Sequence, residues 1–440
     1  MTEELRRGTE RRVRVGVLGC GNVGGALVEL IAEESAAIAA ATGLVLEVRR
    51  VAVRNLSKQR RPPVASALLT HDARGVVTDP EIDVVVELIG GIEPARGLLA
   101  EALKAGKPVV TANKELIANV GGELFGLAEA AGRPLLFEAA VAGAIPLVRA
   151  LQVSLAGERI RRVVGIVNGT TNYVLSQMAD ARIDYGEAVA EAQRLGYAER
   201  DPTADLEGYD ASAKAAILAM IAFNADVVAG DVYREGIADV ALADIDFARR
   251  LGYEVKLLAV AERLGTGAQE RIAVRVHPAM VPQDHPLAGV RGPFNAVFVE
   301  GLAAGELMLY GRGAGGRPTA SAVLGDLLDA ARSLDTPPAI APVRRSRPPI
   351  SPIDELHTQY YLTLDVVDRP GVLAAVATVL GSHGVSIRSM EQIELEGRAR
   401  LVLITHRARE ADVQATLAEL GDLEAVERIG GLLRVLGEEG

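Results

Sequence analysis

The segment from Gly196 to Lys214 holds the densest set of groups that could hold or transfer protons. Glu199 and Asp205 stand among proline and glycine residues, which indicates a loop, and the apolar run after Lys214 indicates a helix. Asp210 and Lys214 are four residues apart, so on that helix they share one face. The apolar neighbours of Lys214 predict partial burial, where a lysine needs a partner and its pKa can fall. We therefore predict a catalytic lysine oriented by a carboxylate; the alternative is an exposed ion pair beside a helix-capping loop.

Other residues that commonly transfer protons or act as nucleophiles are poorly placed. The six histidines lie outside this segment and are predicted to be structural: His71, His277, His285, His357, His383 and His406. Cys20, the one cysteine, has no histidine near it in sequence and cannot form an intramolecular disulfide, which fits a reducing cytoplasm. Lysine is therefore the predicted proton donor.

A glycine-rich loop follows the first apolar run and opens a helix. Its pattern is Gly-x-Gly-x-x-Gly, in which glycines permit a tight turn and let a pyrophosphate approach the helix N-terminus. The residues predicted to contact a dinucleotide here are Gly19, Gly21, Asn22, Val23 and Gly24. The strand and helix on either side make this prediction stronger than the pattern alone.

The choice between the two nicotinamide dinucleotides depends on the end of the second strand. An NAD(H) enzyme usually presents an acidic residue there, whereas this chain has Arg54 followed by Lys58. These cations could receive the 2′-phosphate of NADP(H), or form a solvated basic loop. Further along, the strand ending at Thr111 is followed by Lys114, either a surface lysine or a cation facing an anionic substrate or cofactor.

The elements that position these groups alternate in the first part of the chain. Apolar runs alternate with helical segments: the runs are 13–18, 46–53, 84–88, 108–111 and 135–137, and the helical segments include 23–40 and 93–105. This alternation predicts an α/β fold with a Rossmann-like, doubly wound parallel sheet. We assign the dinucleotide-binding domain to 1–150.

The remaining chain changes character twice. Residues 151–310 have strands at 161–167 and 272–276 flanking alanine-rich helices, which predicts a central α+β domain for catalysis and dimerisation. Prolines and arginines mark 336–356 as a linker, because this composition resists helix and sheet alike. Residues 357–440 then alternate as strand, helix, strand, strand, helix, strand, a ferredoxin-like βαββαβ unit.

Composition excludes several classes of function. The chain has 440 residues, 49% of them hydrophobic, and a formal net charge of −11. That charge argues against a nucleic-acid partner. No run of about 18 uncharged apolar residues occurs and the N-terminus has no apolar core, so we predict neither membrane insertion nor export, and a cytoplasmic protein.

Several motifs together resemble the homoserine dehydrogenase family. They follow one another over residues 13 to about 330: Gly19 to Gly24, Thr111 to Lys114, Val167 to Tyr173, Glu199 to Lys214 and Tyr310 to Thr319. The C-terminal unit, with Asp368 to Leu373 between its first strand and helix, resembles an ACT regulatory domain, on a looser signature. The combination is far more specific than the glycine loop.

The resemblance implies reversible NAD(P)H-dependent reduction of L-aspartate 4-semialdehyde to L-homoserine, in threonine, methionine and isoleucine biosynthesis. It implies that Lys214 protonates the developing alkoxide and that Asp210 orients Lys214. It further implies that Glu199 and Asp205 hold the substrate ammonium and that Lys114 bridges substrate and cofactor. The implied lining of the substrate pocket is Asn168, Gly169 and Thr170.

Further implications concern a cation, the cofactor domain and regulation. The family carries a monovalent cation, usually sodium, at positions that match Glu138 and the backbone of Val141, Gly143 and Ile145. The second glycine cluster, which includes Gly313, would return the chain to the cofactor domain, completing it with about 311–335; an ordinary turn is the alternative. Threonine is the implied effector of residues 357–440, and a homodimer or homotetramer the implied assembly.

Two other functions stay open at this point. One is a reductase of another small amino-acid aldehyde or keto acid that shares the fold. The other is a non-catalytic metabolite sensor, against which the Lys214 and Asp210 pair argues.

Overall fold

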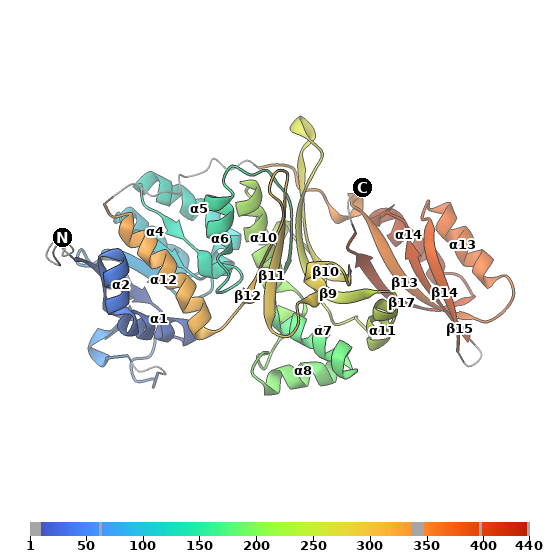
Figure 1. Cartoon of the computed structure of the whole chain (residues 1–440), viewed down its shortest axis with the longest axis horizontal. Coiled ribbons are helices and arrows are strands. Elements are labelled where there is room, and N and C mark those ends of the chain that lie inside the picture. The colour runs from blue at the N-terminus through green and yellow to red at the C-terminus, as the bar shows by residue number, and fades with distance from the viewer. Residues whose placement is uncertain (1–9, 61–63, 336–346, 396–397, 438–440) are drawn as a thin grey trace, which may run out of the picture. The chain divides into compact units, whose positions relative to one another are not determined.

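The structure is a computed structural model that describes residues 10–60, 64–335, 347–395 and 398–437. It contains two compact units (Figure 1). The first comprises Met1–Ile160, Ala216–Gly230 and Glu300–Arg347, and the second Arg161–Ala215, Asp231–Val299 and Pro348–Gly440.

A six-stranded sheet forms the centre of the first unit, with strand order β3-β2-β1-β4-β5-β6. All of its neighbouring strands run parallel. The strands are β1 (Arg11–Leu18), β2 (Leu44–Ala52), β3 (Leu69–Thr70), β4 (Val84–Glu87), β5 (Val109–Thr111) and β6 (Leu135–Leu136). The buried positions of β1 and β4 are mostly valine, because both faces of a parallel sheet are covered. The predicted Rossmann-like sheet is confirmed.

Helices cover this sheet. They are α1 (Asn22–Glu33), α2 (Ser35–Thr42), α3 (Ala73–Thr78), α4 (Ala95–Lys104), α5 (Lys114–Ala131), α6 (Leu147–Arg149) and α12 (Gly316–Arg332), the last preceded by β12 (Gly305–Arg312). Helix α12 lies alongside α1 (Figure 1) and shares one apolar core with β1 and β4. The single helix predicted over 23–40 is wrong: Glu34 leaves helical geometry, with φ −96° and ψ 6°, and separates α1 from α2.

The second unit contains a larger mixed sheet, in which the strand order runs β11-β7-β9-β10-β17-β13-β15-β14. Its first four strands in chain order are β7 (Ile160–Ile166), β9 (Tyr253–Leu264), β10 (Arg271–Pro282) and β11 (Phe294–Gly301), with the short β8 (Tyr233–Arg234) beside β10. Its helices are α7 (Gly169–Ala181), α8 (Tyr185–Arg194), α9 (Thr203–Leu206), α11 (Leu242–Arg250) and the part of α10 (Tyr209–Phe223) up to Ala215. The alanine-rich helix α10 lies between the two predicted strands, as expected, and β9 is a further strand that the sequence did not indicate. Its alanines lie within a strand buried on both faces, which carries no period-two pattern.

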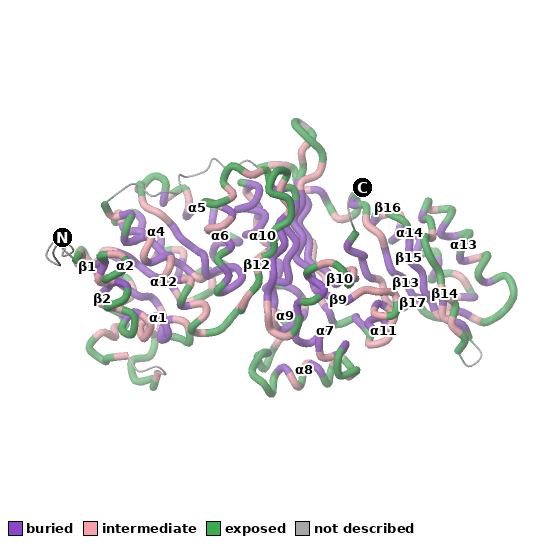
Figure 2. The backbone as a smooth tube through the Cα atoms, viewed as in Figure 1, coloured by how far each residue is buried: buried purple, intermediate pink, exposed green. Residues whose placement is uncertain are grey.

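The C-terminal part has the predicted βαββαβ order. It comprises β13 (His357–Val367), α13 (Val372–Ser382), β14 (Ile387–Leu395), β15 (Arg398–Thr405), β16 (Ala408–Arg409), α14 (Glu410–Gly421) and β17 (Val426–Val435). It has a core of its own, seen as buried strands under its helices in Figure 2.

The C-terminal part shares a sheet with the central strands, which the sequence did not indicate. Strand β17 pairs in parallel with β10, through Ala279 with Arg434 and Met280 with Val435, so one sheet continues from the central strands into this part. Residues 336–346 of the predicted linker lie outside the described residues. After them, the Ile272 N–H donates to the Pro349 carbonyl, and the Ser351 N–H donates to the Ile272 carbonyl. Prolines are tolerated at such an edge of a sheet. In the described part of the chain, no helix is long and apolar enough to cross a membrane.

Candidate active site

Lys214 and Asp210 form the ion pair that their spacing on α10 predicts. The Lys214 Nζ lies 2.7 Å from Asp210 Oδ2 and 2.7 Å from the carbonyl oxygen of Val167, to both of which it donates. The two side chains are 12% and 9% exposed. This pair is therefore largely buried, with a small opening toward solvent, and is unlike an exposed surface pair.

Asn168 joins the pair to the loop before α10. It stands at the N-cap of α7, where its Oδ1 accepts from the Thr171 N–H at 2.8 Å. Its Nδ2 donates to Asp205 Oδ1 at 2.7 Å and to Asp210 Oδ2 at 2.8 Å. The structure thus brings together four of the residues selected from the sequence, with two carboxylates and one lysine among them.

The other residues of the second unit that are predicted to bind substrate are Gly169, Thr170 and Glu199, and the contacts that place them lie outside the Lys214 and Asp210 pair. The Thr170 hydroxyl donates to the Tyr197 carbonyl at 2.8 Å, which ties the start of α7 to the acidic loop. The backbone at Gly169 packs against the Pro293 carbonyl, so that a side chain there would collide. Glu199 is exposed, and among the described residues no hydrogen bond or ion pair joins its carboxylate to the Asn168 cluster. The cluster of Asn168, Asp205, Asp210 and Lys214 is therefore the best-defined part of the site.

The glycine loop in the first unit has the space that a pyrophosphate needs. Gly19 has φ +98°, and a Cβ there would lie 2.5 Å from the Leu88 carbonyl oxygen, so only glycine fits. A Cβ on Gly21 would meet nothing within 4 Å, and no side chain caps the N-terminus of α1, which begins at Asn22. The open backbone and the uncapped N–H groups of α1 fit a bound phosphate.

The ends of β4 and β5 are held together beside this loop. The Thr111 hydroxyl donates to Glu87 Oε2 at 2.6 Å, and Glu87, which is fully buried, also accepts from the Ile89 N–H at 2.7 Å. Asn113 caps α5, which places Lys114 at the first position of that helix. These strand ends line the edge of a parallel sheet where ligands bind.

The basic residues after β2 include one that the sequence analysis missed. Arg54 and Lys58 are exposed, which both interpretations of the basic loop allow. Arg60 lies close enough to Cys20 for its charge to act on that thiol, whose pKa burial raises. Arg60 thus faces the glycine loop. The one signal in the sequence for this is that Arg60 follows two other cations, Arg54 and Lys58.

The turn after β6 surrounds Glu138. Glu138 is 5% exposed, and its two carboxylate oxygens accept from the N–H groups of Val148 and Arg149 at 2.8 and 2.9 Å. Burial raises its pKa, and those backbone hydrogen bonds act in the opposite direction. Ala142 and Gly143 both have left-handed φ angles, of 58° and 59°, and a Cβ on Gly143 would lie 2.4 Å from the Gly313 carbonyl oxygen.

A parallel nucleotide-binding sheet with a phosphate-ready glycine loop, and a buried lysine and carboxylate cluster in the second unit, define a nicotinamide-nucleotide-dependent oxidoreductase. Family models match the chain in three parts: "Homoserine dehydrogenase, NAD binding domain" at 19–138, "Homoserine dehydrogenase" at 146–328, and "ACT domain" at 360–425. The chain belongs to the homoserine dehydrogenase family, whose members act on a CH–OH group.

Individual relatives support this assignment over nearly the whole chain. A homoserine dehydrogenase of Mycobacterium tuberculosis is 48% identical, over 98% of this chain and 99% of that protein. A crystal structure of a homoserine dehydrogenase from Thiobacillus denitrificans matches with a TM-score of 0.91 and 42% identity, covering 97% of this chain and 98% of that one. A hyperthermophilic archaeal homoserine dehydrogenase in complex with NADPH matches with a TM-score of 0.62 and 29% identity, over 73% of this chain and 98% of its own. The predicted activity is confirmed, and the other reductase and the sensor are set aside.

Proposed function

We propose that Lys214 is the proton donor when this enzyme reduces L-aspartate 4-semialdehyde to L-homoserine. The observation that carries the proposal is the position of its Nζ, 2.7 Å from both Asp210 and the Val167 carbonyl in a largely buried site. An ammonium group has three N–H bonds, and these two acceptors use two of them. The third is available to the oxygen of the substrate.

The nicotinamide cofactor, when bound, supplies the hydride that adds to the aldehyde carbon. The aldehyde oxygen then gains negative charge, which the Lys214 ammonium stabilises and neutralises by giving up its proton. Asp210 holds the Lys214 ammonium in place until that transfer, and is a positioning residue. In the reverse direction, neutral Lys214 accepts the proton of the homoserine hydroxyl.

The charge of the cluster supports recognition of the substrate ammonium. Asp205 and Asp210 carry two negative charges and Lys214 one positive charge, so a net negative charge is left beside Asn168. We assign ammonium binding to Asp205, with Glu199 as the second carboxylate. Asn168, Gly169 and Thr170 would line the pocket, and Lys114 would bridge substrate and cofactor.

For the cofactor, we assign the glycine loop together with Thr111 and Gly313, and a preference for NADP(H). The preference is supported by Arg54 and Lys58 after β2, where an acidic residue would repel a 2′-phosphate. Arg60 is added to this set because it faces the loop.

A sodium ion is proposed at Glu138, with the carbonyl oxygens of Val141, Gly143 and Ile145. Each Glu138 oxygen accepts one N–H and has a further lone pair for a hard cation, and the left-handed turn bends the backbone sharply around it. The thermal midpoint should rise in sodium chloride relative to tetramethylammonium chloride of equal ionic strength, and equal midpoints would remove the site from the proposal.

For regulation, we propose that residues 357–440 bind a small amino acid, threonine first, and that the chain forms a homodimer or homotetramer. The turn before α13 supports this, because Gly371 has φ +94° and open space where a Cβ would stand, so its backbone can meet a ligand. Light scattering of the full chain tests the assembly. Initial rates with added threonine test the effect.

The roles at the active site are tested with Lys214→Ala. The variant should still bind NADPH, followed by its fluorescence, while homoserine formation, detected directly, should fall. Lys104→Ala, at an exposed helical lysine, is the matched control and should behave as wild type. A folded Lys214→Ala enzyme with unchanged turnover would move the proton donor elsewhere, with Lys114 first.

A further inference from the structure

Two carboxylates of the active site stand at the ends of one short segment, residues 205–210. Asp205 lies in α9, a helix of four residues, and Asp210 lies in the first turn of α10. Between the two helices Gly208 has φ +77°, so the chain turns sharply there. A helix as short as α9 has little stability of its own, because it forms few internal hydrogen bonds. Contacts from outside the segment are therefore needed to fix the place of Asp205.

Arg234 of β8 makes two such contacts with one guanidinium group. Its Nη1 donates to the carbonyl oxygen of Glu207 at 2.7 Å. Its Cζ lies 3.5 Å from the centre of the Tyr209 ring, within the range of a cation–π interaction. Glu207 and Tyr209 are the residues on either side of Gly208, so the guanidinium contacts the turn from both sides.

The residues after Arg234 contact the same segment through the backbone. The Ile237 N–H donates to the Leu206 carbonyl at 2.9 Å. A Cβ on Gly236 would lie 2.5 Å from the same carbonyl oxygen, so the two backbones are in close contact. These contacts fix Leu206 whichever side chain stands at position 234. The side chain of Arg234 adds a hold on the turn that follows.

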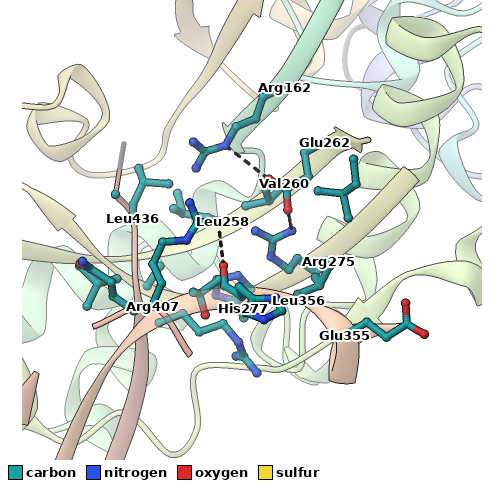
Figure 3. A pocket seen from close by; sticks show the side chains of 18 residues that line it. Arg162, Leu258, Val260, Glu262, Arg275, His277, Glu355, Leu356, Arg407 and Leu436 are labelled. Carbon is teal, nitrogen blue, oxygen red and sulfur yellow. Dashed lines mark hydrogen bonds and ion pairs between the residues drawn. The ribbon is translucent and has the colours of Figure 1, made fainter. Parts of the chain in front are cut away.

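Strand β8 is a firm base for this guanidinium because β8 belongs to the large sheet. It pairs in parallel with β10, where Arg234 lies beside Val276, and the Glu235 N–H donates to the Val276 carbonyl at 2.8 Å. Strand β10 is in turn paired with β9, and the buried Arg275 of β10 donates to Glu262 of β9, as Figure 3 shows. The sheet, and not the segment that is held, therefore carries the guanidinium of Arg234.

We propose that Arg234 is a positioning residue, which sets the place of Asp205 relative to Asp210. The inference rests on the proposed function, in which Asp205 binds the substrate ammonium. Asp210 is held by α10 itself, by Lys214 at 2.7 Å and by Asn168 at 2.8 Å. Asp205 lies outside α10 and accepts from Asn168 at 2.7 Å, so it depends more on the turn that Arg234 contacts. Loss of the guanidinium therefore weakens substrate binding more than proton transfer.

Steady-state oxidation of homoserine by NADP tests the proposal on the full-length enzyme. Arg234→Met keeps an unbranched stem but removes the guanidinium, so KM for homoserine should rise about 10-fold, the order of one lost hydrogen bond of a charged group. The accompanying change in kcat should be less than about 2-fold, because the Lys214 and Asp210 pair stays in place. A lower kcat with an unchanged KM for homoserine would overturn the proposal.

Two milder variants divide the contact of the guanidinium. Tyr209 is 54% exposed, so Tyr209→Leu leaves the core intact, and it should raise KM about 3-fold, the scale of one cation–π contact. Arg234→Lys keeps the charge but replaces the planar fork by a point donor, and should lie between wild type and Arg234→Met. If Arg234→Met does not fold, a wild-type KM in both milder variants would overturn the proposal.

Arg250→Met is the matched control. Arg250 lies on α11, where it likewise combines a polar contact and a ring contact: it pairs with Glu391, and its Cζ lies 5.3 Å from the centre of the Phe247 ring. Neither partner belongs to residues 205–210, so KM for homoserine should stay at the wild-type value. An equal rise of KM in Arg250→Met and Arg234→Met would mean that the effect is not specific to the turn, and would overturn the proposal.

Asp205→Asn separates a failure of this inference from a failure of the proposed function. A wild-type KM for homoserine in Asp205→Asn would remove the ammonium from Asp205, and this inference with it. A raised KM in Asp205→Asn beside a wild-type KM in Arg234→Met would overturn this inference alone.

The double variant of Asp205→Asn and Arg234→Met tests whether the two residues act together. If Arg234 acts through Asp205, the second change should raise KM no further than Asp205→Asn alone, because the carboxylate that Arg234 positions is already lost. Two effects that multiply would mean that Arg234 acts by another route, and would overturn the inference while the ammonium assignment stands.

Discussion

Two buried clusters of charge in the second unit use different cations. Lys214 in the active site donates to one carboxylate and one carbonyl, and its side chain keeps a small opening to solvent. Arg434 at the junction of β10 and β17 is 2% exposed and donates to Glu410 at 2.9 and 2.8 Å and to Glu235 at 2.9 Å. A lysine can release a proton, whereas a guanidinium cannot do so in a protein. Of these two clusters, only the one with the lysine can take part in proton transfer, and the arginine cluster can only hold structure.

Exchanging the cation in the active site should have the largest effect. Lys214→Arg keeps the charge but cannot donate the proton, so kcat should fall by roughly 10²- to 10⁴-fold, the range of general acid catalysis. Asp210→Asn should fall between this variant and wild type, because it removes only the orientation. Steady-state rates with homoserine and NADP measure both.

Two results would contradict this view of the active site. Near wild-type kcat in Lys214→Arg would mean that a fixed charge is enough there. A loss in Asp210→Asn as large as in Lys214→Arg would make Asp210 more than a positioning residue.

Replacing Arg434 at the junction of β10 and β17 should lower the free energy of unfolding. Burial opposes ionisation of Glu410, but Arg434 outweighs it and lowers the pKa of Glu410, so the pair is charged. Arg434→Met leaves that carboxylate buried without its guanidinium, which costs about 3–5 kcal/mol. Arg434→Lys should lie between, because one ammonium cannot reproduce a bidentate contact. Urea unfolding of the full chain measures the loss.

An exposed pair in the same sheet provides the control. Arg398 and Glu427 are 3.2 Å apart with side chains 58% and 37% exposed, so Arg398→Met should cost about 0–1 kcal/mol. If Arg434→Met lowered the free energy of unfolding by a similarly small amount, the buried pair of Arg434 and Glu410 would be worth no more than a surface pair.

The two clusters also differ in how far the sequence reveals them. Asp210 and Lys214 are one helical turn apart, so local periodicity predicts their contact, and the strand, loop and helix around Gly19 to Gly24 are similarly local. The junction cluster joins β8, β10, α14 and β17, and no spacing rule relates residues so far apart. For the same reason the sequence predicts a linker before the C-terminal part but not the pairing of β17 with β10, which has no local signal.

Changing the basic loop after β2 should alter the choice of cofactor more than the turnover. If Arg54 meets the 2′-phosphate, Arg54→Asp should raise the Michaelis constant for NADPH about 10-fold, the worth of one charged hydrogen bond of roughly 1.5 kcal/mol, and leave that for NADH nearly unchanged. Arg50→Asp, at an exposed arginine within β2, is the matched control. Equal changes for both cofactors would leave Arg54 as a residue of a solvated loop.

A third buried cation, Lys256 on β9, should have the smallest effect, seen only in the pH dependence of stability. It is 2% exposed, its Nζ lies 3.3 Å from Asn172 Oδ1, and burial lowers its pKa to about 8. In the unfolded chain a lysine titrates near 10.4. Between these values the unfolded chain binds more protons than the folded one, so the free energy of unfolding rises with pH, by at most about 1.4 kcal/mol per pH unit. Below pH 8 both states are protonated and this slope vanishes.

Lys256→Met should therefore remove part of the rise that wild type shows between pH 8 and 10, with Lys104→Met as the exposed control. Parallel wild-type and Lys256→Met curves across that window, measured by urea unfolding, would mean that Lys256 keeps its ordinary affinity for the proton.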